Sequence, residues 1–237
     1  MSGGLYTRGE YLANNPTWHA EDAAWKASQV LTMLNRHGLR PQNVCEVGCG
    51  VGQVLRELHD RMGHQPNFVG YEISPQAFEL AVSRSSERLT FRLGDVLEDD
   101  ESFDLTLLID VVEHVEDYFS LLRGLRARSG HAMLHIPLEL SVLSMLLDTP
   151  LTFSRDRLGH LHFFTRDIAL GMIRRVGYEI LDWRFTAASS QYPRGSWKLR
   201  AVERARRMVF PLNQGAAVRI LGGYSLLVLC SPAETTQ

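Results

Sequence analysis

The stretch Val44–Gly52, which reads VCEVGCGVG, places three glycines at alternate positions directly after a short apolar run. A dinucleotide-binding loop would read G-x-G-x-x-G, and a P-loop would end in Gly-Lys-Ser or Gly-Lys-Thr. The spacing here is E-x-G-x-G-x-G, with Glu46 two residues before the first glycine. The stretch therefore predicts a strand, a loop and a helix that bind a ligand other than a pyrophosphate. The glycines are Gly48, Gly50 and Gly52.

Outward from this loop, short apolar runs alternate with helical patterns. Strands that alternate with helices at this spacing form parallel βαβ units in a doubly wound sheet. Two later strands would close the sheet with an antiparallel hairpin at its edge. The sequence thus predicts an α/β fold with a Rossmann-like, mostly parallel, seven-stranded sheet and an antiparallel last strand. The strands are expected at residues 43–47, 68–72, 89–93, 103–109, 131–136, 178–185 and 223–230.

Apolar residues with helical spacing fill the intervals between several of these strands. Gly38 and Pro41 end the first helix, and Pro75 suits the first turn of another one. Thr165 is expected to cap the last of them. The helices are expected at residues 18–37, 51–62, 118–127 and 166–176, with one more after Pro75.

The composition limits the class of protein. A chain of 237 residues fits one α/β domain, and 25 basic against 27 acidic residues give no field that would favour nucleic acid. Three cysteines are too few and too scattered for a disulfide framework or a zinc ribbon. The first residues lack the apolar core of a signal peptide, and no apolar run reaches the length of a spanning helix. We expect a cytoplasmic, single-domain protein over residues 1–237.

Acidic residues stand at the ends of the first four expected strands. Because the carboxyl ends of parallel strands meet at one edge of the sheet, these carboxylates should share one crevice. A carboxylate beside the glycine loop disfavours phosphate and suits a cationic amine, and Glu72 is placed to accept both hydroxyls of a ribose. The implied ligand has a ribose and either hydrogen-bond donors or positive charge, and it has no phosphate. The four acids are Glu46, Glu72, Asp95 and Asp110.

S-adenosylmethionine has a ribose, an adenine amine, an ammonium and a sulfonium. The sequence resembles the class I S-adenosylmethionine-dependent methyltransferases of the small-molecule type. The segments VCEVGCGVG, VGYEIS, RLGDVL and FDLTLLIDVVEHVED are similar to successive motifs of that family, in the same order and at family spacing. The resemblance covers roughly residues 18–229 and ends in GGYSLLVLC, which is similar to the family's final antiparallel strand. It implies S-adenosylmethionine as cofactor and S-adenosylhomocysteine as product.

By this resemblance, the loop glycines line the methionine portion of the cofactor, and Glu46 reaches its amine directly or through water. Glu72 takes the ribose hydroxyls. Asp95 accepts a hydrogen bond from the adenine amine, and the backbone N–H of Val96 donates to the ring. Asp110 sits beside the cofactor and faces the substrate. The expected cofactor-binding residues are Glu46, Gly48, Gly50, Gly52, Glu72, Ile73, Asp95, Val96 and Asp110.

Methylation of an oxygen usually needs a base as well as an aligned acceptor, and histidine is the natural candidate. His160 and His162 alternate just before the helix that Thr165 opens, so their side chains should point in opposite directions. We expect His160 to contact the acceptor and His162 to face the core. His114 is the third catalytic candidate.

The residues around His114 allow two interpretations. Asp110, Glu113 and His114 could place three ligands for a divalent metal within one helical turn. We favour the interpretation without a metal, in which His114 packs or contacts the cofactor. His135, near the end of the fifth expected strand, could face either the pocket or a helix.

The remaining segments are assigned by position. Residues 1–40 would form an N-terminal helical lid, 41–137 the cofactor-binding core, and 138–165 and 187–215 insertions on the substrate side. The second insertion is basic and amphipathic, so it could contact an anionic substrate, a membrane surface or a second subunit of a homodimer. Its relevant residues are Trp197, Lys198, Arg200, Arg204, Arg206, Arg207, Met208 and Phe210.

Together these features predict O-methylation of a small molecule, such as a secondary metabolite or a precursor of a sugar or lipid. N-methylation of a small molecule is one alternative, because removing a proton is then less demanding. The other alternative is a cofactor-binding partner protein without catalysis. A nucleic-acid substrate is disfavoured by the near-neutral charge and by the absence of an Asn/Asp-Pro-Pro-Tyr/Phe signature.

Overall fold

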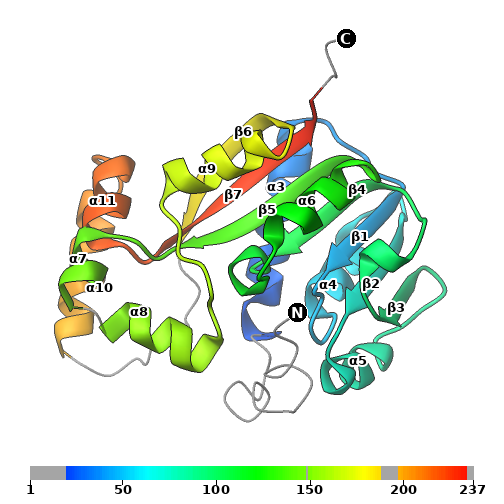
Figure 1. The fold of residues 1–237 in the computed structure, drawn as a ribbon, viewed down its shortest axis with the longest axis horizontal. Helices are drawn as coiled ribbons and strands as arrows, with labels where there is room; N and C mark the ends of the chain where they lie inside the picture. The colour runs from blue at the N-terminus through cyan, green and yellow to red at the C-terminus, as the bar shows by residue number, and fades with distance from the viewer. Residues whose placement is uncertain (1–19, 148, 188–196, 234–237) are drawn as a thin grey trace.

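A seven-stranded sheet forms the centre of the molecule in the computed structural model, which describes residues 20–147, 149–187 and 197–233 (Figure 1). The strand order is β3-β2-β1-β4-β5-β7-β6. The first five strands are parallel to one another, and β7 runs antiparallel between β5 and β6. The predicted α/β fold class is therefore confirmed. The strands are β1 (Asn43–Val47), β2 (Asn67–Glu72), β3 (Leu89–Leu93), β4 (Phe103–Ile109), β5 (Ser129–Leu138), β6 (Tyr178–Ala187) and β7 (Tyr224–Pro232).

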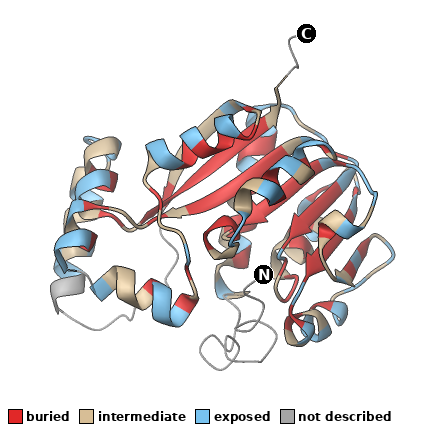
Figure 2. Cartoon of the chain, viewed as in Figure 1, coloured by how far each residue is buried: buried red, intermediate tan, exposed pale blue. Residues whose placement is uncertain are grey.

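Helices cover both faces of the sheet. Apolar residues of α3 (Ala23–Arg36) and α4 (Gln53–Arg61) pack in one core layer. Residues of α6 (Tyr118–Arg126) and α9 (Arg166–Arg175) pack in the other layer. Burial on both faces explains why the inner strands of the sheet are coloured mostly as buried in Figure 2, whereas the edge strands β3 and β6 are mixed. The helix after Pro75 is α5 (Pro75–Val82).

A second group of helices lies beyond the carboxyl end of β5, on the left in Figure 1. This group contains the described parts of both expected insertions. Residues 188–196 of the second insertion lie outside the described residues. The helices are α7 (Val142–Leu147), α8 (Thr149–Phe153), the π-helical turn η4 (Ser154–Leu158), α10 (Trp197–Val209) and α11 (Gln214–Leu221).

Several element boundaries differ from those expected, and each difference has a local cause. The helix expected from residue 51 begins at Gln53, because Gly52 has a left-handed backbone with φ of 74°. The strand expected at 131–136 extends to Leu138, because β7 pairs with it beyond the apolar run. The first helix begins as the 3-10 turn η1 (Ala20–Asp22), and residues 1–19 of the expected lid lie outside the described residues.

The basic face expected in the second insertion is partly used within the fold. Arg206 pairs with Glu203 at 2.6 Å and donates from Nη2 to the carbonyl of Leu221 at 3.0 Å. Phe210 stacks on Tyr224. The side chains of Trp197 and Lys198 lie outside the described part of the chain. None of the described helices combines the length and the apolar character that crossing a membrane requires.

Candidate functional site

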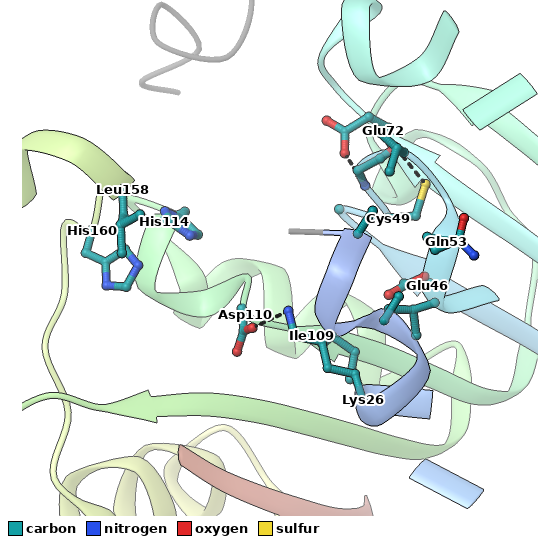
Figure 3. Close-up of a pocket in the computed structure, with 16 residues that line it drawn as sticks. Lys26, Glu46, Cys49, Gln53, Glu72, Ile109, Asp110, His114, Leu158 and His160 are labelled. Atoms are coloured by element: carbon teal, nitrogen blue, oxygen red, sulfur yellow. Dashed lines mark hydrogen bonds and ion pairs between the residues drawn. The ribbon is translucent and has the colours of Figure 1, made fainter. Parts of the chain in front are cut away.

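A polar pocket lies at the carboxyl ends of β1, β2 and β4, as expected for a doubly wound sheet (Figure 3). The glycine loop, the start of α3 and the segment around η4 form its walls. Five of the predicted cofactor-binding residues line it. They are Glu46, Gly48, Gly50, Glu72 and Asp110.

The glycine loop has a backbone that other residues adopt only with strain. Gly48, Gly50 and Gly52 have φ angles of 64°, 55° and 74°. A Cβ atom on Gly52 would lie 2.4 Å from Cε1 of Phe91, a distance that requires the ring to move. The backbone N–H of Cys49 donates to the carbonyl of Tyr71 at 3.0 Å and ties the loop to β2. The loop is therefore a fixed surface that a ligand can approach closely.

Glu72 links the second strand to this loop. It is buried, and its Oε2 accepts a hydrogen bond from the backbone N–H of Gly50 at 2.8 Å. Its Oε1 accepts one from the backbone N–H of Ser74, also at 2.8 Å. Burial raises the pKa of Glu72, and these backbone bonds oppose the rise. Each carboxylate oxygen has a further lone pair, so the group can still accept hydrogen bonds from a ligand.

Glu46 is the acidic residue at the floor of the pocket. Its residue exposure is only 3%, and Oε2 has no hydrogen-bond partner among the described residues. The pKa of Glu46 is raised to about 8, chiefly by burial. The positive charge of Lys26 lowers this pKa, and the negative charges of Glu72 and Asp110 raise it. A buried carboxylate oxygen without a partner is unfavourable, so a cationic ligand group would stabilise it.

Asp110 joins a buried lysine and a buried histidine and has a strained backbone. Its φ of 55° is unusual for a residue other than glycine. Oδ2 lies 2.8 Å from Nζ of Lys26, and Oδ1 lies 2.6 Å from Nδ1 of His135. Burial would raise the pKa of Asp110, but Lys26 and His135 hold it well below its usual range. The other nitrogen of His135, Nε2, lies 2.9 Å from Oγ1 of Thr186, so His135 belongs to a buried network and does not line this pocket.

The three catalytic candidates occupy two different surroundings. His160 is buried, lines the pocket, and places Nδ1 2.7 Å from Oε2 of Glu139. His114 also lines the pocket, with its ring centroid 4.7 Å from that of His160. His162 is half-buried, contacts the ring of Tyr118, and lies within hydrogen-bond distance of the carbonyl of Val115. The alternation expected for residues 160 and 162 is therefore present.

Gly52 of the glycine loop and three further predicted cofactor-binding residues do not line this pocket. Asp95 accepts a hydrogen bond from the backbone N–H of Leu97 at 2.9 Å and caps a 3-10 turn. Val96 is buried, and Ile73 is 48% exposed. All three follow β2 or β3, on the side of the sheet beyond the glycine loop. Their contacts with an adenine ring or a ribose remain predictions.

Sequence reasoning did not identify Lys26, Cys49 or Glu139 as site residues. Lys26 could have been found, because it is a charge on the apolar face of α3 between Ala23 and Val30. Glu139 gives no such signal, since only the fold brings it to His160. Cys49 lines the pocket, but burial and the nearby Glu46 carboxylate raise the pKa of its thiol well above the usual range.

A family model described as a methyltransferase domain matches residues 18–182. Norajmaline N-methyltransferase of Rauvolfia serpentina is 32% identical over 92 residues, 35% of this chain and 31% of that protein. A probable chloroplastic tocopherol O-methyltransferase of Oryza sativa subsp. japonica is 35% identical over 86 residues, 33% of this chain and 23% of that protein. These matches span less than a third of either curated relative.

Solved structures share the fold at low sequence identity. Magnesium protoporphyrin IX methyltransferase from Synechocystis PCC 6803, with bound S-adenosylhomocysteine, aligns with a TM-score of 0.61 and 16% identity, over 89% of this chain and 83% of that one. A putative sarcosine dimethylglycine methyltransferase from Galdieria sulphuraria aligns with a TM-score of 0.61 and 15% identity, over 88% and 86% of the two chains. At these identities the likeness concerns the fold alone.

Proposed function

This chain belongs to the methyltransferase family, and we propose that it methylates a hydroxyl oxygen of a small molecule with S-adenosylmethionine as the methyl donor. The observation that carries this proposal is the division of the pocket into two ends. Acidic side chains and the glycine loop form one end, and His160 stands at the other (Figure 3). Glu139, which does not itself line the pocket, holds His160 there.

The first end suits the amino-acid part of the cofactor. The unpartnered Oε2 of Glu46 would accept from its ammonium, and Lys26, which lines the same pocket, would pair with its carboxylate. Glu72 would accept from the ribose hydroxyls with lone pairs that Gly50 and Ser74 leave unused. When bound, S-adenosylmethionine supplies a methyl group activated by a positively charged sulfur. The residues of this chain orient it and exclude water.

The second end suits the acceptor. His160 is held by Glu139 at 2.7 Å, so its ring cannot turn freely, and it lines the same pocket as Asp110. A histidine fixed in this way can hold a hydroxyl in line with the methyl group. An oxygen acceptor gains more from such a residue than a carbon or sulfur acceptor does, which supports the choice of oxygen.

Two measurements test the proposal. S-adenosylhomocysteine should raise the melting temperature in a concentration-dependent way, because a ligand that binds only the native state stabilises it. Formation of S-adenosylhomocysteine from S-adenosylmethionine should then rise with small hydroxylated acceptors in a panel that also contains matched amines. A protein that is stabilised by NAD and does not respond to S-adenosylhomocysteine would refute the cofactor. Binding without turnover across the panel would favour the partner protein without catalysis.

N-methylation is the second candidate, and one comparison favours it. Norajmaline and ajmaline N-methyltransferases of Rauvolfia serpentina are 32% and 30% identical to this chain over 92 residues. An amine acceptor can be methylated without a strong base, so turnover of the amines in the panel with none of the hydroxyls would select this function instead.

A further inference from the structure

We propose that Glu113, His114 and His160 bind a divalent cation at the acceptor end of the pocket. One ligand atom from each residue lies within 4.8 Å of the other two. Tetrahedral ligands of one ion stand about 3.6 Å apart when each bond is about 2.2 Å. Closing the cluster around an ion therefore needs side-chain movements of about 1 Å, which rotamer adjustments supply.

The strongest evidence is the burial of the Glu113 carboxylate and its lack of hydrogen bonds within the described residues. The residue is fully buried, with 0% exposure, and neither carboxylate oxygen has a hydrogen-bond partner among the described residues. A buried carboxylate in this condition is unfavourable unless it is paired or binds a metal. Its own backbone is fixed, because its carbonyl accepts from the N–H groups of Leu161 and His162 at 2.8 and 3.1 Å. Glu113 is thus held beside the segment that carries His160.

Both histidines have the outer partners that metal ligands use. Nδ1 of His160 lies 2.7 Å from the carboxylate of Glu139, and Nδ1 of His114 lies 3.2 Å from the carbonyl of Gly159. A metal-binding histidine almost always uses its second ring nitrogen in such a bond, which fixes the ring and its tautomer. The left-handed Gly159, with φ of 77°, turns the chain so that both segments meet here.

Asp110 is not part of this set, although its spacing with Glu113 and His114 suggests a metal site. Its two oxygens already pair with Lys26 and His135 at 2.8 and 2.6 Å. The third ligand comes instead from residue 160, more than forty positions along the chain. The inference therefore depends on contacts in the fold and not on the local spacing.

The chemistry of the ligand set indicates which ions fit. Two imidazoles and one carboxylate suit Mn²⁺, Fe²⁺, Co²⁺ or Zn²⁺ better than Ca²⁺, and three protein ligands leave coordination positions for a bound oxygen. An acceptor hydroxyl that binds such an ion loses its proton to water more readily, since the ion stabilises the resulting oxyanion. This step rests on the proposed function and gives His160 the role of a ligand.

The test measures ion binding directly. The untagged protein is stripped with a chelator and titrated with Mn²⁺ and, separately, Zn²⁺ by equilibrium dialysis, with S-adenosylhomocysteine affinity measured on the same samples. We expect one ion per chain, and Glu113→Gln and His160→Ala should each weaken ion binding on the order of tenfold or more. His162→Ala is the matched control, because this histidine lies outside the pocket, and it should leave ion binding unchanged.

Three outcomes separate the possibilities. Normal S-adenosylhomocysteine binding with no ion bound to the wild type would overturn the metal site and leave the proposed function standing. Ion binding that survives both Glu113→Gln and His160→Ala in folded proteins would also overturn it, because the ion would then sit elsewhere. Loss of S-adenosylhomocysteine binding in the wild type would refute the proposed function, whatever the ion does.

Discussion

Lys26 and Asp110 form a buried ion pair that connects the first long helix to the end of β4, with 2.8 Å between Nζ and Oδ2. The pair lies at the wall of the pocket, between the glycine loop and the histidines (Figure 3). It fixes α3 over the carboxyl edge of the sheet, so the stability of the fold and the shape of the site depend on the same two side chains.

Lys26→Met should reduce the free energy of unfolding by about 3–5 kcal/mol, because it leaves Asp110 buried without its main partner. Chemical denaturation of the ligand-free protein measures the loss. Arg36→Met is the control: Arg36 belongs to the same helix and pairs with Asp182, but its side chain is 63% exposed. That change should cost at most about 1 kcal/mol. Similar losses in both variants would contradict the structural role of the buried pair.

Binding of S-adenosylhomocysteine should release a proton below pH 8. The pKa of Glu46 in the ligand-free fold, about 8, lies above its ordinary value of 4.5, so the group is mostly protonated between these limits. An ammonium favours the carboxylate, so affinity should rise with pH and level off above about 8. Titration calorimetry at pH 6.5, in two buffers with different ionisation enthalpies, measures the proton release. Glu46→Gln should abolish it.

The same shift affects the stability of the ligand-free protein. The folded state holds a proton on Glu46 that the unfolded state loses above about pH 4.5, so this group's contribution favours unfolding as the pH rises from 4.5 to 8. Glu46→Gln should flatten that part of the stability curve. An unchanged curve in the folded variant would show that Glu46 does not titrate in this range.

Glu72→Ala should weaken S-adenosylhomocysteine binding on the order of tenfold or more, since hydrogen bonds to a charged group contribute roughly 1.5–3 kcal/mol each. It also leaves the N–H groups of Gly50 and Ser74 without their partner. Titration calorimetry measures the affinity, and circular dichroism checks the fold. Glu79→Ala, at an exposed site in α5, should change neither. Unchanged affinity in folded Glu72→Ala would exclude the ribose role.

Gly52→Ala should destabilise the fold more than Gly38→Ala does. Both glycines have similar φ angles, 74° and 64°, so each substitution carries about the same backbone strain of roughly 1–2 kcal/mol. Only at Gly52 does the new Cβ meet a side chain, the ring of Phe91 at 2.4 Å. The difference between the two unfolding free energies isolates that clash. Equal losses would show that the ring moves aside at little cost.

His160→Ala should lower turnover by about 10²–10⁴ and leave S-adenosylhomocysteine affinity near normal, because the residue stands at the acceptor end of the pocket. His162→Ala should mainly reduce stability, through the lost contact with Tyr118. Steady-state kinetics and thermal melts on both variants separate the two effects. Full activity in His160→Ala together with an inactive, folded His162→Ala would reverse the two roles.

The parts of this molecule that depend on local pattern were predictable from the sequence. The first four strands and the glycine loop are buried runs with a clear period, so their limits were placed to within one residue. The acids that follow them reach one edge of the sheet because parallel strands dictate it. The antiparallel hairpin was also foreseen, since two late apolar runs remained without partners.

The parts that depend on long-range packing were not predictable. Glu139 and His160 meet because η4 and Gly159 turn the chain back onto the end of β5, and no spacing encodes that turn. Lys26 lies on an otherwise apolar helical face, and the sequence pattern of the helix gives no reason for its charge. Only the fold brings its partner Asp110 opposite it. Likewise, the order β5-β7-β6 gives His135 its partner Thr186 on β6, which the sequence alone leaves open.

The position of β7 has a consequence for how the protein is made. This strand is the last of the seven to leave the ribosome, yet it lies between β5 and β6 in the finished sheet. Within the described residues, β6 pairs with β7 and with no other strand. During translation β6 therefore has no strand to pair with until residues 224–232 emerge. The sheet is therefore completed only after β7 has emerged, and until then the unpaired edges of β5 and β6 are the surfaces that a chaperone would need to protect.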